Sequence, residues 1–190
     1  MIRISAGRFK GLRLATPPQI RATEGKVRQA LFNILGSFVE DARVIDAFAG
    51  SGALGLEALS RGAAFVAFIE SDTDAILSLR DNVERLAAEL SRGAWRIFHL
   101  DVERGLRALA REQPPFDLIL LDPPYRTDEG KKTLITVGEC AMLATSGLVV
   151  IEHERRAEMP LAIGHLTRDR QHRYGDTVLS FYRATGSHKR

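Results

Sequence analysis

The chain has 190 residues, of which 45% are apolar, and a net charge of +3. This length suits one well-cored domain with a small appendage, and the lack of an apolar run of about 18 residues excludes a membrane-spanning helix. The only cysteine, Cys140, excludes an intrachain disulfide and predicts a cytoplasmic protein. The five histidines show no metal-ligand spacing, so we expect no metal site.

Basic residues are concentrated at the N-terminal end. Residues 1–30 hold seven basic side chains and one acid, whereas the other 160 residues have a net charge of −3. This asymmetry indicates that a nucleic acid docks there, although a merely solubilising surface would have the same composition. The predicted contacts are Arg3, Arg8, Lys10, Arg13, Arg21, Lys26 and Arg28.

The same segment predicts a small hairpin and a helix. Residues 1–14 combine alternating apolar positions with a glycine-containing turn, which indicates a hairpin. Apolar residues recur every three or four positions in 26–38, which indicates an amphipathic helix. If this helix packs on a sheet, its basic start lies near the sheet edge that binds ligand. We therefore separate residues 1–40, a nucleic-acid-contacting appendage, from a main domain at 41–185.

Strands and helices alternate through the main domain. Strands are predicted at 43–46, 63–70, 95–101, 116–122 and 147–154, and helices at 52–62, 72–90, 103–112 and about 129–143. Residues 165–183 predict two further strands joined by a tight turn, hence an antiparallel hairpin at the sheet edge. The fold class is α/β, with a doubly wound and mostly parallel sheet.

Four predicted strands end in an acid. These residues are Asp46, Glu70, Asp101 and Asp122. Sheets of this class bind ligands at the carboxyl ends of their strands, where the winding reverses. Four carboxylates on one such edge predict a ligand rich in hydroxyl groups and amines.

A glycine loop joins the first strand of the main domain to its helix. The stretch DAFAGSGALG (46–55) contains Gly50-x-Gly52-x-x-Gly55, and Glu70 follows at the distance of an acid that binds a ribose diol. These features alone permit a nicotinamide dinucleotide. A carboxylate at Asp46 opposes a pyrophosphate, however, and favours the ammonium and sulfonium groups of S-adenosylmethionine.

We therefore expect S-adenosylmethionine as the cofactor, with Glu70 binding the ribose and Asp101, together with Val102, near the adenine. A helix cap is the competing role for Asp101. The predicted cofactor contacts are Asp46, Phe48, Gly50, Gly52, Glu70, Asp101 and Val102.

The stretch DPPY (122–125) ends the most apolar strand. Two prolines fix a stiff turn, so the Asp122 carboxylate and the Pro123 carbonyl can both accept hydrogen bonds from a planar amine. The lone pair of the amine then points at the methyl carbon, while Tyr125 stacks on the ring of the substrate. The predicted catalytic residues are Asp122, Pro123 and Tyr125. An incidental tight turn is the competing interpretation.

Several segments together resemble a known family. RISAGRFKGLRL, RATEGKVRQALFNIL, DAFAGSGALGLEALSRGA, FDLILLDPPY and RYGDTVLSFYR are similar to the RsmD family of class I S-adenosylmethionine-dependent methyltransferases. Family members usually read close to RPTxDRVRExLFN at residues 21–33, where this chain has Ala22, Gly25 and Lys26 instead of proline, an acid and arginine. The resemblance implies a seven-stranded sheet and transfer of methyl to guanine N2 in small-subunit (16S) ribosomal RNA of bacteria, within a small-subunit particle.

Other functions remain open from the residues. DPPY also suits an adenine-N6 DNA methyltransferase or a protein glutamine-amide methyltransferase, although no target-recognition domain is evident. A non-catalytic RNA-binding or assembly factor would not need the acids, and an NAD oxidoreductase would need a proton donor that is not apparent. We expect a monomer, because no exposed apolar stripe is evident.

Overall fold

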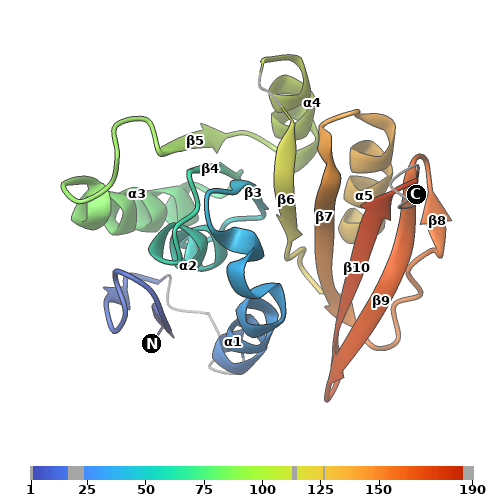
Figure 1. Cartoon of the computed structure of the whole chain (residues 1–190), viewed down its shortest axis with the longest axis horizontal. Coiled ribbons are helices and arrows are strands. Elements are labelled where there is room, and N and C mark those ends of the chain that lie inside the picture. Colours follow the sequence, from blue (N-terminus) through green and yellow to red (C-terminus); the bar gives the residue numbers. More distant parts are fainter. Residues whose placement is uncertain (1, 17–23, 113–114, 126, 186–190) are drawn as a thin grey trace.

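The computed structural model describes residues 2–16, 24–112, 115–125 and 127–185 (Figure 1). The elements are β1 (Ile2–Arg3), β2 (Arg13–Leu14), α1 (Glu24–Leu35), η1 (Gly36–Val39), β3 (Arg43–Ala47), α2 (Ala53–Ser60), β4 (Phe65–Glu70), α3 (Thr73–Ala87), β5 (Trp95–His99), α4 (Val102–Glu112), β6 (Phe116–Leu121), α5 (Glu129–Glu139), β7 (Leu143–Glu154), β8 (Ala162–Ile163), β9 (Leu166–Tyr174) and β10 (Thr177–Ala184). The predicted alternation of strand and helix is confirmed.

The main sheet has the order β5-β4-β3-β6-β7-β10-β9-β8. Strands β3 to β7 are parallel to their neighbours, whereas β10, β9 and β8 continue the sheet in antiparallel pairs. This arrangement confirms the doubly wound α/β class with a C-terminal hairpin. The main sheet has eight strands rather than the expected seven, because the two-residue strand β8 adds to the edge strand β9.

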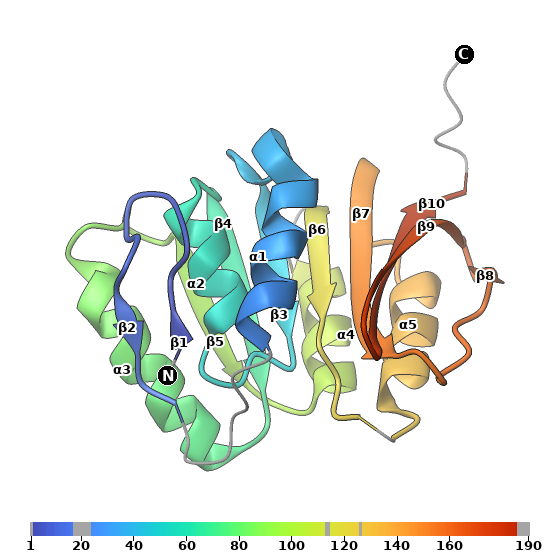
Figure 2. The same ribbon diagram turned by 90° about the horizontal axis from the view of Figure 1, so that it is seen from below.

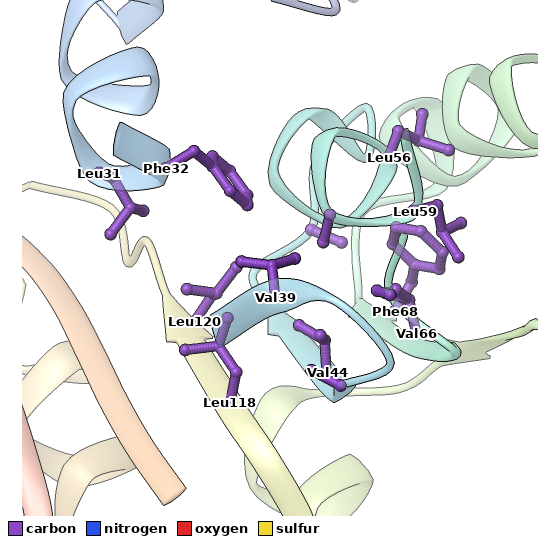
Figure 3. Packing of buried hydrophobic residues seen from close by; sticks show 14 of the residues in the cluster. Leu31, Phe32, Val39, Val44, Leu56, Leu59, Val66, Phe68, Leu118 and Leu120 are labelled. Atoms are coloured by element: carbon purple, nitrogen blue, oxygen red, sulfur yellow. The ribbon is translucent and has the colours of Figure 1, made fainter. Parts of the chain in front are cut away.

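Each face of the sheet carries its own apolar core. Helices α1, α2 and α3 cover one face, and α4 and α5 cover the other (Figures 1 and 2). Figure 3 shows the first core, in which helices and strands contribute Leu31, Phe32, Val44, Leu56, Leu59, Val66, Phe68, Leu118 and Leu120. The central strands are apolar throughout, since both of their faces are buried.

The winding reverses between β3 and β6. The chain runs outward from β3 through β4 to β5, then returns to pair β6 on the other side of β3. The loops that follow β3, β4, β5 and β6 therefore meet at one edge, which we call the carboxyl edge. This is where sheets of this class bind their ligands.

Several predicted boundaries were wrong, among them the start of β7, which was expected at residue 147 and lies at Leu143. The helix expected at 26–38 ends at Leu35 and continues as the 3-10 turn η1, because Gly36 has a positive φ of 53°. The helix expected up to residue 143 ends at Glu139, where Cys140 becomes extended. Strand β7 then begins at Leu143, which pairs with Phe116. None of the helices in the described part of the chain is long and apolar enough to cross a membrane.

The N-terminal hairpin is confirmed and is anchored by a buried acid. Ile2 pairs with Leu14 and Arg3 with Arg13. Glu57 of α2 is completely buried, and its two oxygens accept hydrogen bonds from the backbone N–H groups of Ser5 (2.8 Å) and Ala6 (3.1 Å). Helix α1 and the hairpin share one apolar core with α2 and α3, and the division at residue 40 stays a prediction.

A second anchor joins the hairpin to the glycine loop. Asn82 of α3 is completely buried. Its amide accepts from the N–H of Ala15 (2.7 Å) and donates to the carbonyls of Ala15 (2.8 Å) and Ser51 (2.9 Å). One side chain thus fixes both the end of the hairpin and the loop before α2.

Candidate active site

A cleft of about 560 Å³ opens at the carboxyl edge. Its walls come from the segments after β3, β4, β5 and β6, together with α5. The lining includes Phe48, Glu70, Ser71, Asp72, Asp101, Val102, Glu103, Asp122, Pro124, Glu129, Lys132, Thr133 and Thr136. The structure therefore brings five predicted site residues together in one cleft: Phe48, Glu70, Asp101, Val102 and Asp122. The contribution of α5 was not predicted, since nothing in its sequence marks it as part of a site.

Asp46 lies behind the cleft rather than on its wall. Its side chain is 1% exposed and accepts a 2.7 Å hydrogen bond from the Gly55 N–H in the first turn of α2. Burial raises the pKa of Asp46 to about 7, and the nearby Glu70 also raises it. Gly50 and Gly52 are likewise absent from the lining. Asp46 therefore fixes the glycine loop to β3, which the sequence did not predict.

The glycine loop needs unusual backbone torsions. Gly52 has a φ of 84°, and a Cβ there would lie 2.4 Å from Leu79 Cδ1. Phe48 also has a positive φ, 64°, although it is not glycine. This places Phe48 in the cleft while the loop turns sharply into α2.

Glu70 ties the end of β4 to the glycine loop. One oxygen accepts from the Gly50 N–H at 2.7 Å, and the other accepts from Ser71 and Asp72 N–H groups at 2.7 and 2.8 Å. A carboxylate has about four acceptor positions, so roughly one remains for a ligand hydroxyl. Glu70 thus shapes the cleft and can also bind a ligand.

Asp101 caps α4, as its competing interpretation proposed. Its Oδ1 accepts from the Arg104 N–H at 3.0 Å, and its Oδ2 lies 3.2 Å from Arg104 Nε. Asp101 also lines the cleft, as does Val102 beside it. The two interpretations are therefore compatible.

The DPPY turn forms another part of the cleft wall, at the end of the strand next to β3. Asp122 and Pro124 line the cleft, and Pro123 is buried against Gly130. The Pro124 carbonyl accepts a 2.9 Å hydrogen bond from Thr127 Oγ1, which stabilises the turn. The turn thus presents Asp122 to the cleft from a fixed backbone.

Tyr125 points to the other side of this turn. Its hydroxyl donates to Glu152 Oε1 at 2.7 Å and lies 3.2 Å from Thr177 Oγ1, while 46% of the residue is exposed. It lines a second cleft of about 260 Å³ together with Pro123, Pro124 and Glu152. Burial raises the pKa of Tyr125 and that of Glu152. Tyr125 and Asp122 therefore stand on two sides of one rigid turn.

Glu152 was missed by the sequence analysis, although its signal was present. The predicted strand GLVVIEHE also ends in acids, as the four strands before it do. In the described part of the chain, no three or more His, Cys, Asp or Glu side chains come together as a metal site.

The predicted contact at Arg28 was wrong. Arg28 is 7% exposed, its Nη2 donates to the Arg3 carbonyl at 2.6 Å, and its Nε lies 3.9 Å from Glu57. The guanidinium is thus buried and makes its contacts within the protein, because the face of α1 that carries Arg28 packs against α2 and the hairpin. Arg21 lies outside the described residues.

The other predicted contacts are exposed but lie in different places. They are Arg3, Arg8, Lys10, Arg13 and Lys26. Arg8 lies at the hairpin turn, where its N–H bonds to the Ser60 carbonyl and its side chain pairs with Glu89. Ser60 and Glu89 follow the ends of α2 and α3, so this turn lies away from the carboxyl edge (Figure 2).

Lys26 lies near the carboxyl edge, where the cleft opens. Helix α1 leads into β3 through a short turn, so its last residues are near the start of β3 and its first residues are near the carboxyl edge (Figure 2). The expected position of the start of this helix is therefore confirmed.

Asp46 should make the stability of the protein depend on pH. The carboxyl has a pKa near 3.8 in an unfolded chain and about 7 in the folded protein. Between these values the unfolded chain releases a proton that the folded chain keeps, so the free energy of unfolding falls as pH rises, by about 1.4 kcal/mol per pH unit. The free energy of unfolding, measured by urea denaturation, should fall more between about pH 5 and about pH 6.5 in wild type than in Asp46→Asn. Equal losses would contradict the assignment.

Comparisons with known proteins agree over nearly the whole chain. Residues 2–183 match the family described as Conserved hypothetical protein 95. The chain is 37% identical to the Bacillus subtilis protein named "Putative rRNA methyltransferase YlbH", over 97% of this chain and 100% of that protein. It is 33% identical to "Ribosomal RNA small subunit methyltransferase D" of Escherichia coli K12, over 95% of this chain and 89% of that protein.

A solved structure has the same fold. "Putative methyltransferase yhhF from Escherichia coli" has a TM-score of 0.82 and 33% identity, over 96% of this chain and 97% of that chain. The family match, the relatives and the fold lead to one conclusion. The chain belongs to the RsmD family of ribosomal RNA methyltransferases.

Proposed function

We propose that the protein transfers a methyl group from S-adenosylmethionine to the exocyclic N2 of a guanine in small-subunit (16S) ribosomal RNA. The observation that carries this proposal is the position of Asp122. The carboxylate ends a central strand and shares one cleft with Phe48, Glu70 and Val102. A cofactor in this cleft and an amine at Asp122 would therefore be neighbours.

The cleft fits the chemistry of S-adenosylmethionine. Its wall is rich in acids, among them Glu70, Asp72 and Asp101. Carboxylates suit the hydroxyl groups and the positive charges of this cofactor and oppose a pyrophosphate. Glu70 would accept from a ribose hydroxyl, while Phe48 and Val102 would pack on the adenosine.

Catalysis would depend on positioning. When bound, the cofactor supplies an electrophilic methyl on a sulfonium. Asp122 and the Pro123 carbonyl accept the two amine N–H groups, so the nitrogen lone pair can face the methyl. Such positioning can lower a barrier by roughly 7–11 kcal/mol in favourable cases. Asp122 also stabilises the positive charge that the amine gains as it attacks.

The RNA would approach across the carboxyl edge. Lys26 would contact a phosphate there, and phosphate contacts position an RNA without reading its sequence. The target guanine must leave its stack, which RNA loops allow more readily than duplexes. We place the substrate in a small-subunit particle in the bacterial cytoplasm, with the enzyme acting as a monomer.

The proposal is tested by mapping the methyl group. The protein is incubated with labelled S-adenosylmethionine and, separately, with naked ribosomal RNA, assembled small subunits, DNA and a release-factor-like protein. Label on guanine N2 of small-subunit RNA is the expected result. Label on adenine, on glutamine or on no substrate would overturn the proposal.

Glu70 should be needed for cofactor binding. Glu70→Ala removes a charged acceptor and frees the Gly50 N–H, so calorimetry should show affinity for S-adenosylmethionine about 10- to 100-fold weaker. Glu103→Ala is the matched control, because Glu103 lines the same cleft but its side chain is 61% exposed. Equal effects of the two changes would contradict a specific role for Glu70.

Lys26 should contribute to the salt dependence of RNA binding. Each lost phosphate contact reduces the slope of log affinity against log salt by about 1. We expect Lys26→Gln to show this reduction in binding titrations with small-subunit RNA. Lys10→Gln serves as the control, since Lys10 is also exposed but belongs to the hairpin turn at the other edge. If both variants behave alike, the position of Lys26 is not what matters.

A further inference from the structure

The second cleft is adjacent to the proposed site of methyl transfer. It has a volume of about 260 Å³, and its lining includes Pro123, Pro124, Tyr125 and Glu152. The first two form the turn that separates it from the cofactor cleft, and Pro124 lines both. A planar base held against this turn would have one edge close to Asp122.

Glu152 is the neighbour of Asp122 on the next strand of the sheet. Leu121 of β6 pairs with Ile151 of β7 in parallel register, so Asp122 and Glu152 are the next residues on neighbouring strands. Parallel neighbours lie about 4.8 Å apart, and residues in register project to the same face. The two residues are thus adjacent at the sheet edge, with Asp122 lining the first cleft and Glu152 the second, and both carboxyl groups lie near the Tyr125 hydroxyl.

The orientation of Glu152 is fixed by its neighbours. Oε1 accepts from the Tyr125 hydroxyl at 2.7 Å, and Thr177 Oγ1 lies 3.2 Å from that hydroxyl. Among the described residues, no lysine or arginine pairs with Glu152. Oε2 therefore makes no ion pair with a described residue, and Arg156 is the basic side chain that lines the same cleft.

The edge of guanine offers the complementary groups. Guanine presents N1–H and the N2 amine side by side, so every position on that stretch of its edge is a donor. Adenine presents the acceptor N1 beside its amine. A carboxylate therefore attracts the N1–H edge of guanine and repels N1 of adenine. Two acceptors that face each other in a buried site weaken binding strongly.

We propose that Glu152 is the specificity-determining residue for guanine, accepting the N1–H while Asp122 accepts the N2 amine. This inference rests on the proposed function and names the group that selects its substrate. Tyr125 keeps Glu152 in place through its hydroxyl and packs its ring against the base. The methyl acceptor is thereby read by two carboxylates on adjacent strands.

The test changes one edge of the base and one group of the protein. Two RNA fragments carry, at the mapped target position, either guanine or 2-aminopurine, which keeps the C2 amine, has an acceptor at N1 and lacks O6. The loss of O6 is common to both proteins, so the difference in preference between them reports on N1. Glu152→Gln keeps an oxygen for the Tyr125 hydroxyl and replaces the other oxygen by a donor. Rates of methylation of both fragments are measured for both proteins.

Wild type should prefer guanine by about 10- to 100-fold, the effect of one hydrogen bond to a charged group. Glu152→Gln should lose most of this preference, since its amide donates to N1 of 2-aminopurine and opposes N1–H of guanine. Tyr125→Phe keeps the carboxylate but loses the hydroxyl that orients it, so its preference should lie between those of wild type and Glu152→Gln. The affinity of Glu152→Gln for S-adenosylmethionine and its melting temperature should match those of wild type.

The possible failures are distinguishable. If wild type methylates guanine and the preference is the same in Glu152→Gln, the role of Glu152 is wrong and the proposed function stands. If Tyr125→Phe loses the preference as fully as Glu152→Gln, the tyrosine hydroxyl and not the carboxylate selects the base, which also overturns the inference. If wild type labels no guanine N2, the proposed function itself fails.

Discussion

Asp122→Ala is expected to abolish methyl transfer while leaving the cofactor bound. The change removes the acceptor that orients the amine and the charge that stabilises the nitrogen as it attacks. Loss of one such preorganised group lowers kcat by on the order of 10³-fold. Affinity for S-adenosylmethionine should change little, because Glu70 and the glycine loop remain. Single-turnover rates and calorimetry measure the two quantities separately.

Asp122→Asn refines this prediction. Asparagine keeps one acceptor oxygen but no charge, so its rate should lie between those of wild type and Asp122→Ala. Asp74→Ala is the matched control, because Asp74 is exposed in the first turn of α3 and belongs to the lining of neither cleft. Loss of cofactor binding in Asp122→Ala would show that Asp122 belongs to the cofactor site and does not hold the amine.

Glu57→Ala is expected to destabilise the protein severely. Glu57 is completely buried and accepts from the Ser5 and Ala6 N–H groups, from Ser5 Oγ at 2.6 Å and from Arg61 Nε at 2.8 Å. Its removal leaves these donors and the nearby Arg28 charge buried without their acceptor. Breaking one side of a buried ion pair costs about 3–5 kcal/mol, which urea denaturation can measure.

Glu89→Ala provides the comparison for Glu57. Glu89 pairs with Arg8 on the surface, where both side chains are 59% exposed. Surface pairs of this kind contribute at most about 1 kcal/mol. If the two variants have the same free energy of unfolding, Glu57 does not anchor the hairpin as we describe.

The fold could be predicted because its signals are local. Unbroken apolar runs such as FDLILL mark strands covered on both faces, and regular spacing in DTDAILSLRDNVERLAAEL marks an amphipathic helix. Helix ends were less predictable. Helix α1 ends where Gly36 takes a positive φ, and α5 ends where Cys140 becomes extended shortly before β7 pairs with β6. The two-residue strand β8 carries no pattern long enough to detect.

The candidate site was predictable where sequence position determines side-chain position. A residue that ends a parallel strand lies at the carboxyl edge, which is why Glu70 and Asp122 were correctly placed in one cleft. Asp46 obeys the same rule but turns inward to the Gly55 N–H. Strand position fixes the backbone, whereas burial of a side chain depends on what packs over it.

Charge alone was the weakest guide. Arg28 and Glu57 are charged residues in the sequence, yet the fold pairs them in the interior. The difference arises from long-range packing between α1, α2 and the hairpin, which no local pattern encodes. The strand-end rule applied to GLVVIEHE points to its last residue, Glu154, and to the nearby Glu152, and only the observed register selects Glu152.

The buried amide of Asn82 has a mechanical consequence. Its hydrogen bonds hold both Ser51, in the glycine loop, and Ala15, at the end of the hairpin. An RNA that displaced Ala15 would strain the Asn82 hydrogen bonds that also hold Ser51 in the glycine loop. Any coupling of the two places through Asn82 would act equally in both directions, because linkage is reciprocal.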